Sequence, residues 1–206
     1  DSLSKMRLND FQVVSDSKYR VLLSPFSSKT GRNQPSNSRF VFGSSVWLRS
    51  LIKPQKGRGL AYVDWFQQEF GIAGALSKDE KMIESCQSSD PYLSFAKHAG
   101  QVPETATKES HPKERSLFKA TVLAVQYGMG AKSLAESISV PLEEAKYILL
   151  LHRRTFSKFW IWSEGCVDYI LTNKRIWTTF GWQLKLSGEI NTRSLANFPM
   201  QANGAE

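Results

Sequence analysis

The sequence has few of the residues that build disulfide-linked, zinc-binding or membrane-spanning proteins. Its two cysteines, Cys86 and Cys166, lie far apart without CxxC spacing, so we predict neither a disulfide scaffold nor a zinc site. No apolar run approaches the roughly 20 residues of a membrane-spanning helix. The first ten residues, DSLSKMRLND, lack the apolar centre of a signal peptide. We therefore expect a cytoplasmic protein with no membrane partner.

Acidic residues are scarce in one part of the chain. The net charge is +8, and residues 1–60 hold 11 Lys and Arg against 3 Asp and Glu, whereas residues 61–206 hold 16 against 16. A basic segment with Asn, Ser and Gln among its cations favours contact with a phosphate backbone, and a merely solvated basic surface is the alternative. With 41% hydrophobic and 12% aromatic residues, the composition is that of a folded domain with a substantial core.

The stretch RSLFKATVLAVQYG, residues 115–128, predicts a helix with one chemically distinct face. Arg115, Lys119, Leu123 and Tyr127 are spaced by four residues, so they spiral over roughly 120° of the helix surface. Two cations one turn apart can hold successive phosphates of one polyphosphate, and the aromatic ring can meet a base. The alternative is an ordinary amphipathic helix with solvated cations, whose core-facing residues would be Leu117, Val122, Val125 and Met129.

A second stretch, GRGLAYVDWFQQEF, ends an apolar run with one carboxylate. Residues 60–63 predict a buried strand, and Asp64 follows it directly. A carboxylate there is costly unless a positive group meets it, and a divalent metal ion is a common solution. The alternative is that Asp64 caps a helix that begins near Trp65. Both interpretations stay open on these residues alone.

The first of these stretches resembles motif B of the family A DNA polymerases: Arg, three residues, Lys, seven residues, Tyr-Gly. Here those positions are Arg115, Lys119, Tyr127 and Gly128, and Leu123 stands where Phe or Tyr is commoner. The resemblance implies a fingers helix that closes over the incoming deoxynucleoside triphosphate. Arg115 and Lys119 would bind its phosphates, Lys119 would also be catalytic, Leu123 would lie by the nucleotide, and Tyr127 would lie beside the templating base.

The second stretch resembles motif A of the same family, DYSQIELR in many members and DWFQQEFG here. The resemblance implies that Asp64 ligates two catalytic Mg²⁺ ions, assisted by the main-chain carbonyl of Trp65. Glu69 would sit under the sugar of the incoming nucleotide and exclude a 2′-hydroxyl, and Gln67 would belong to the same nucleotide site. Tyr92 stands where the family commonly has a His that approaches the triphosphate.

Two further segments resemble DNA-contacting parts of the family. Thr-Gly-Arg at residues 30–32 precedes Asn33 and Gln34 in a Ser-, Asn- and Pro-rich loop, and the resemblance implies that Arg32 reaches the minor groove of the primer–template duplex. An ordinary surface arginine is the alternative. Near the other end, Asn197 and Gln201 match residues that contact the minor groove and the templating strand.

The resemblance covers residues from about 20 to 206 and implies an α+β fold, an incomplete right-hand polymerase with an antiparallel palm sheet and helical fingers. The implied domains are a palm portion at 1–100, fingers at 101–174 and a return to the palm at 175–206. Periodicity predicts a strand or hairpin within residues 1–28, a helical segment over 72–83 with a break at Ser77, and a connector at 101–114. It also predicts helices from Pro141 to about His152 and over 156–172, and a hairpin within 175–186.

Function follows from the resemblance as an expectation: a DNA-directed DNA polymerase that extends a primer on a template using two Mg²⁺ ions. Phosphoryl transfer with two metal ions needs at least two carboxylate ligands, and in this sequence Asp64 alone qualifies as such a ligand. The family's second ligand comes from a His-Asp-Glu motif that would follow residue 206, so we expect a piece of a longer polymerase whose companion segment supplies it. The alternatives are a catalytically incomplete DNA- or nucleotide-binding fragment and a helical domain without a nucleic-acid role.

Overall fold

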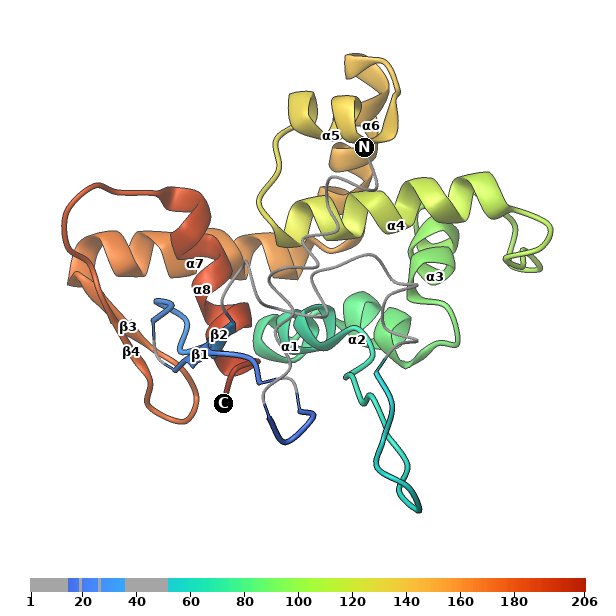
Figure 1. The fold of residues 1–206 in the computed structure, drawn as a ribbon. Helices are drawn as coiled ribbons and strands as arrows, with labels where there is room; N and C mark the ends of the chain where they lie inside the picture. Colours follow the sequence, from blue (N-terminus) through green and yellow to red (C-terminus); the bar gives the residue numbers. More distant parts are fainter. Residues whose placement is uncertain (1–14, 19, 26, 36–51) are drawn as a thin grey trace. The chain divides into compact units, whose positions relative to one another are not determined.

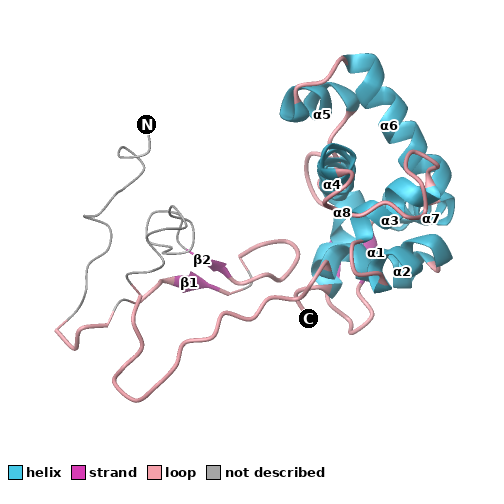
Figure 2. Cartoon of the chain, turned by 90° about the vertical axis from the view of Figure 1, so that its right-hand side faces the viewer, coloured by secondary structure: helices cyan, strands magenta, loops and turns pink. Residues whose placement is uncertain are grey.

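The computed structural model describes residues 15–18, 20–25, 27–35 and 52–206. The chain divides into two compact units between Trp65 and Phe66, and the larger unit holds residues 66–204 and Glu206. Nearly all the regular structure of the larger unit is helical (Figures 1 and 2). In the described part of the smaller unit, only β1 (Leu23–Ser24) and β2 (Gln34–Pro35) are regular. They pair antiparallel, Leu23 opposite Pro35.

The hairpin expected within residues 1–28 is therefore only partly as predicted. Its first strand, β1, lies in that range, but its partner β2 lies beyond it, and Gln34 belongs to β2 rather than to the loop. Residues 1–14 lie outside the described residues, so the first half of the predicted alternating run is not tested.

The prediction of a strand at residues 60–63 is wrong. Residues 52–65 contain no helix or strand, and the side chains are largely solvent-exposed, Leu60 at 63% and Val63 at 87%. A strand exists through hydrogen bonds to a neighbouring strand, and no described segment pairs with this one. The helix-cap alternative for Asp64 is wrong as well, because the next helix, α1 (Gln68–Ser77), begins four residues later with Gln67 at its N-cap position.

Three short helices open the larger unit: α1, α2 (Glu80–Gln87) and α3 (Pro91–His98). The predicted break at Ser77 is confirmed, because Lys78 in the left-handed conformation ends α1. The Asp79 carboxylate then caps α2 by accepting from the Met82 N–H at 3.1 Å. In the same way Asp90 caps α3, with a proline as the first helical residue. Asp and Asn at N-caps and Pro at the first turn satisfy or remove helix N–H groups that have no partner in the helix.

Four helices follow: α4 (Pro112–Gln126), α5 (Ala131–Ile138), α6 (Leu142–Thr155) and α7 (Ser157–Asn173). The two predicted helices after Pro141 are confirmed, although α6 extends to Thr155. The connector is shorter than predicted, since residues 112–114 are already helical and the proline provides the first residue of α4. The chain then forms the predicted hairpin from β3 (Arg175–Trp177) and β4 (Gln183–Lys185).

The last helix, α8 (Thr192–Asn203), is capped by the side chain of Asn191. It packs against α7 and returns to α1 (Figure 1), where the amide of Gln68 donates to the carbonyl of Gly204 at 2.8 Å. This contact joins the first and last helices of the larger unit.

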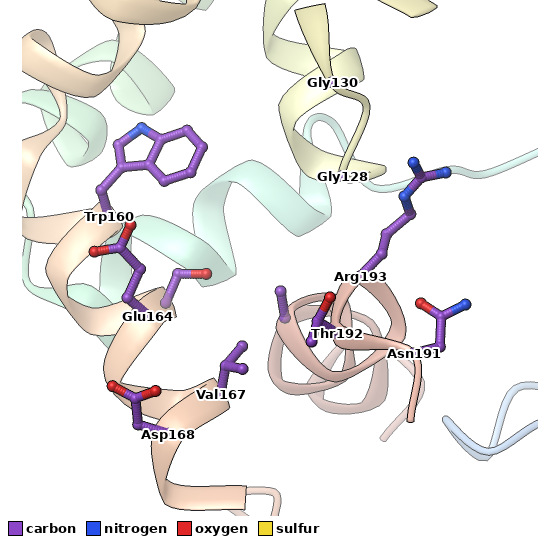
Figure 3. A pocket seen from close by; sticks show the side chains of 11 residues that line it. Gly128, Gly130, Trp160, Glu164, Val167, Asp168, Asn191, Thr192 and Arg193 are labelled. Atoms are coloured by element: carbon purple, nitrogen blue, oxygen red, sulfur yellow. The ribbon is translucent and has the colours of Figure 1, made fainter. Parts of the chain in front are cut away.

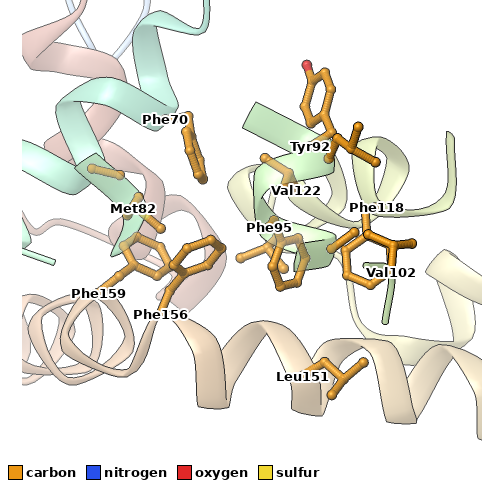
Figure 4. Close-up of a cluster of buried hydrophobic side chains, with 14 of the residues drawn as sticks. Phe70, Met82, Tyr92, Phe95, Val102, Phe118, Val122, Leu151, Phe156 and Phe159 are labelled. Carbon is orange, nitrogen blue, oxygen red and sulfur yellow. The ribbon is translucent and has the colours of Figure 1, made fainter. Parts of the chain in front are cut away.

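Aromatic side chains from α1, α3, α4, α7 and the junction between α6 and α7 fill the main core of the larger unit (Figure 4). Its buried phenylalanines are Phe70, Phe95, Phe118, Phe156 and Phe159. Trp160 and Trp162 are partly buried and pack against this cluster. On α4, Val122 and Val125 are buried as predicted and Leu117 packs beside them, but Met129 is 36% exposed, because α4 ends before it.

His152 is a buried titratable residue that the sequence did not single out. It is 1% exposed and packs edge-on against the rings of Phe95 and Phe156. Its Nδ1 accepts a hydrogen bond from Trp160 Nε1 at 3.1 Å. Burial lowers the pKa of His152 from 6.5 to about 3, because a charged imidazole is poorly solvated among aromatic rings. The residue is therefore neutral in the folded protein at neutral pH.

Acid should destabilise the fold through His152. The unfolded chain takes up a proton near pH 6.5 and the folded chain only near pH 3, so stability falls as the pH falls between these values. One such proton changes the free energy of unfolding by about 1.4 kcal/mol per pH unit, or about 2–3 kcal/mol from pH 6 to pH 4. Urea unfolding of the wild type and His152→Leu across this range should show the difference. Equal slopes for wild type and His152→Leu would contradict the prediction.

Candidate functional site

The predicted face of α4 is present, and the structure brings its two cations to one aromatic ring. Arg115 is half-buried and Lys119 is exposed. The guanidinium carbon of Arg115 lies 5.6 Å from the ring centroid of Tyr92, and Lys119 Nζ lies 5.8 Å from it. Leu123 is half-buried one turn further along. Tyr127 is 51% exposed and forms the C-cap of α4 rather than a helical residue.

Asp90, at the start of α3, holds the guanidinium of Arg115 on α4 in place. Its Oδ2 forms an ion pair with Arg115 Nε, while its Oδ1 accepts from the Leu93 N–H at 3.2 Å to cap α3. The Asp90 side chain is only 15% exposed, so the pair is well shielded from water. We did not predict Asp90 as a site residue. The Asp-Pro dipeptide marks Asp90 as a helix cap. No residue near it in the sequence indicates that it also pairs with Arg115, 25 positions later.

Gln67 completes the arrangement by donating a hydrogen bond from its side-chain amide to the hydroxyl of Tyr92. Gln67 has a positive φ of 52°, a left-handed conformation that is uncommon for residues other than glycine. We call the five residues Gln67, Asp90, Tyr92, Arg115 and Lys119 the α4 cation cluster. Two cations beside a single carboxylate leave a net positive site, which suits a polyphosphate.

Glu69 and the pair Asn197 and Gln201 lie on other helices of the larger unit. Glu69 is half-buried in the first turn of α1, two residues after Gln67. Asn197 and Gln201 are both half-buried on α8, and their spacing of four places them on one face of that helix.

A cleft of about 780 Å³ opens between the end of α4, the middle of α7 and the start of α8 (Figure 3). Gly128 lies at its edge with a φ of +64°, and a Cβ there would come 2.4 Å from Arg193 Cγ. Glycine therefore suits this backbone position, because a larger residue would be strained there and would require Arg193 to shift. Arg193, a cation that lines this cleft, was not predicted; its place one turn before Asn197 is the signal that could have identified it.

The remaining predicted residues belong to the smaller unit. Arg32 and Asn33 lie in the loop between β1 and β2, where the N–H of Arg32 donates to Ser28 Oγ at 3.1 Å. This hydrogen bond holds the loop backbone next to Arg32. Asp64 and Trp65 lie at the end of the unit and are exposed, Trp65 by 78%.

No group of three or more His, Cys, Asp or Glu side chains within residues 15–18, 20–25, 27–35 and 52–206 is arranged to hold an ion. Asp64 offers one carboxylate, whereas the implied Mg²⁺ pair needs at least two. In the same described part of the chain, no helix has the length and apolar character to cross a membrane.

Comparisons with known proteins point to one family. The family model for DNA polymerase family A matches residues 36–206. DNA polymerase I of Helicobacter pylori is 28% identical over 134 residues, covering 65% of this chain and 14% of that protein. The DNA polymerase of Mycobacterium phage L5 is 27% identical over 136 residues, covering 65% of this chain and 21% of that protein. This chain thus spans a small part of the length of either relative.

A solved structure shows the same fold. The POL domain of Pol1 from M. smegmatis, in complex with DNA primer-template and dNTP, superposes with a TM-score of 0.72 at 23% sequence identity. The match covers 95% of this chain and 36% of that one. The expected fold class, an incomplete α+β polymerase fold rich in helices and with small antiparallel sheets, is therefore confirmed.

Proposed function

This chain belongs to DNA polymerase family A, and from that premise we propose that it is the part of a DNA-directed DNA polymerase that binds the incoming deoxynucleoside triphosphate. The observation that carries the proposal is the α4 cation cluster, in which Arg115 and Lys119 meet at Tyr92.

The polymerase would extend a primer on template DNA in replication or repair, in the cytoplasm of a bacterial or virus-infected cell. We assign residues 1–100 and 175–206 to its palm and 101–174 to its fingers.

Within this proposal Arg115 and Lys119 bind different phosphates of the triphosphate. Asp90 occupies Arg115 Nε, while the two terminal amino groups of Arg115 have no hydrogen-bond partner among the described residues. Those two groups form the planar fork that binds two oxygens of one phosphate. Lys119 is exposed and would serve as a compact charge for the next phosphate, with the catalytic role of stabilising charge that develops there.

The other predicted residues receive roles by the same family match. Leu123 would contact the incoming nucleotide, Tyr127 would lie beside the templating base, and Asn197 and Gln201 would contact the duplex and the template. Single substitutions should separate these roles, because nucleotide contacts change KM for the triphosphate and duplex contacts change primer–template affinity. Equal effects of Leu123→Ala and Gln201→Ala on both quantities would contradict the assignment.

In the smaller unit we assign Arg32, Asn33 and Gln34 to the primer–template duplex. Asp64 and the carbonyl of Trp65 would be this chain's contribution to the Mg²⁺ site, whose ions would activate the primer end and hold the triphosphate when bound. The described residues supply one carboxylate, so we propose that a companion segment supplies the remaining ligands.

A second candidate function is a catalytically incomplete fragment that binds DNA and nucleotide without chemistry. The lack of a three-residue metal-binding group in the described part of the chain favours it. Primer extension by the purified chain, assayed alone and with a downstream His-Asp-Glu segment of a relative supplied in trans, separates the two. Extension that depends on Asp64 supports the polymerase, whereas binding without extension under both conditions supports the second candidate.

Nucleotide binding itself is tested by titrating the 206-residue chain with a deoxynucleoside triphosphate and with labelled primer–template, each at two salt concentrations. We expect both ligands to bind, and the affinity for DNA to fall as salt rises, because cations that neutralise phosphates release counterions. Absence of binding by both ligands would overturn the proposal.

Glu69→Ala should relax the rejection of ribonucleotides in a polymerase that contains this segment. Glu69 stands five residues after Asp64, where the family places the residue under the nucleotide sugar. Incorporation of ribonucleotides relative to deoxynucleotides should rise by about 10-fold or more, the scale on which loss of one steric or hydrogen-bonding discrimination acts. The control is Glu84→Ala on α2, an exposed carboxylate. An unchanged ratio in Glu69→Ala would show that another residue excludes the 2′-hydroxyl.

A further inference from the structure

We propose that Tyr92 is a positioning residue, which orders the two phosphate-binding cations through its ring and does not bind phosphate through its hydroxyl. The inference rests on the proposed function and gives a mechanism to one position of that site. It differs from the simplest expectation for this position, in which a polar side chain in place of the common His would contact the triphosphate directly.

The ring of Tyr92 is held by the core and presented to both cations. Tyr92 is 5% exposed, belongs to the main hydrophobic cluster, and lies at its margin in Figure 4, with the hydroxyl directed away from the other labelled side chains. Arg115 and Lys119 approach the ring at 5.6 Å and 5.8 Å, within the range of a cation–π interaction. One rigid ring therefore restrains two long, flexible side chains.

The hydroxyl of Tyr92 already has a partner. Gln67 donates to it from the N-cap of α1, so the hydroxyl links two helices within the larger unit. The side chain as a whole is almost fully shielded from solvent, which leaves little of its surface for a bulky anionic ligand. The part of Tyr92 that acts on the ligand is then its aromatic face, through the cations.

Two residues at the start of α3 hold the guanidinium of Arg115 in place. Asp90 forms an ion pair with Arg115 Nε. Two residues later, the ring of Tyr92 lies next to the guanidinium carbon of Arg115. The Asp90 carboxylate is itself fixed, because it caps α3. Arg115 is consequently held in one orientation before any ligand arrives, and a preorganised side chain loses less conformational entropy on binding.

Removal of the ring should weaken binding of a polyphosphate even though no cation is lost. Without the ring, both cationic side chains must be ordered when the ligand binds, and ordering costs a few-fold in affinity for each immobilised side chain, so loss of the ring should weaken binding by about 5–30-fold. Tyr92→Phe keeps the ring and loses only the hydroxyl, so it should bind within about 2-fold of the wild type. Tyr92→Leu removes the ring and should show the full loss.

The test is calorimetric titration of the 206-residue protein with inorganic tripolyphosphate at low salt, using wild type, Tyr92→Phe and Tyr92→Leu. Thermal unfolding of each variant confirms that it is folded, and Tyr92→Met replaces Tyr92→Leu if the latter is not. Full affinity in Tyr92→Phe with weak binding in the leucine or methionine variant is the expected result. Wild-type affinity without the ring, or a phenylalanine variant as weak as the leucine variant, would overturn the inference.

Two further variants separate this inference from the proposed function. Arg115→Ala and Lys119→Ala remove the cations themselves and should bind tripolyphosphate more weakly than any Tyr92 variant. If both bind it as well as the wild type, the phosphate site is wrongly placed and the proposed function fails. If they lose affinity and the ring-less variant does not, the phosphate site stands and only the positioning role of Tyr92 is lost.

Discussion

Asp79→Ala is expected to lower the free energy of unfolding by about 3–4 kcal/mol, because one buried carboxylate satisfies the starts of two helices. Asp79 is 3% exposed. One oxygen accepts from the Met82 N–H in the first turn of α2, and the other accepts from the Phe159 N–H in the first turn of α7 at 3.1 Å. Alanine leaves both N–H groups buried without partners, and hydrogen bonds to charged groups are worth about 1.5–3 kcal/mol each.

The adjacent residue provides the matched control. Glu80 forms an ion pair with Lys158 at 2.6 Å between the same two helix starts, but both side chains are more than half exposed. Water screens such a pair, so Glu80→Ala should change stability little. Urea unfolding of the two alanine variants measures the difference. Similar losses in both variants would show that the link between α2 and α7 does not depend on the buried hydrogen bonds.

Lys119→Ala should reduce kcat/KM for deoxynucleoside triphosphates by about 100–1,000-fold in a polymerase that contains this segment. The magnitude is that of removing one preorganised group that stabilises charge developing during the reaction. Lys119 reaches the site from the exposed side of α4, and its loss leaves the core residues Val122 and Val125 untouched. The defect should therefore appear in nucleotide use with only a small change in thermal stability, since the lost contact with the Tyr92 ring contributes little.

Lys113→Ala is the control for that experiment. Lys113 lies on the same helix but lines a different cleft, together with Ile138, Val140 and Glu144, so its loss changes the overall charge equally without touching the α4 cation cluster. Steady-state kinetics of the two variants on one primer–template decide the matter. Equal kcat/KM values in the two variants would show that net charge, and not the position of Lys119, governs nucleotide use.

The positions of α4, α6 and α7 and the cation pair on α4 were predicted because their signals are local. Proline at residues 91, 112 and 141, and Asp or Asn before α2, α3 and α8, mark helix starts through groups within one turn. The spacing of Arg115 and Lys119 fixes their common face through helix geometry alone. Family likeness supplied the roles of these residues, which spacing alone left open.

Other features depend on contacts between distant segments. A strand at residues 60–63 needs a neighbour for its hydrogen bonds, and an apolar run carries no information about whether that neighbour is present. The partners of Asp79 and Arg115 lie 80 and 25 positions away. The burial of His152 likewise arises from rings on α3, on α7 and at the junction between α6 and α7, although on its own helix it is one of several basic residues near the C-terminus.

The hydrogen bond from Gln68 to Gly204 closes a loop of 136 residues, and this has a consequence for the order of folding. Helices α1 to α6 mainly contact neighbours in sequence, so their contacts form at small loop-closure cost. For α8 to pack onto α1, the chain between them must either be folded already or be closed into a single long loop. Contacts between residues so far apart in the sequence form slowly. We therefore expect α8 to join the folded unit late, and its amide hydrogens to gain protection after those of α3 and α4 in a pulse-labelling experiment. During synthesis, the surface of α1 that receives α8 would then stay exposed until almost all of these residues have been made.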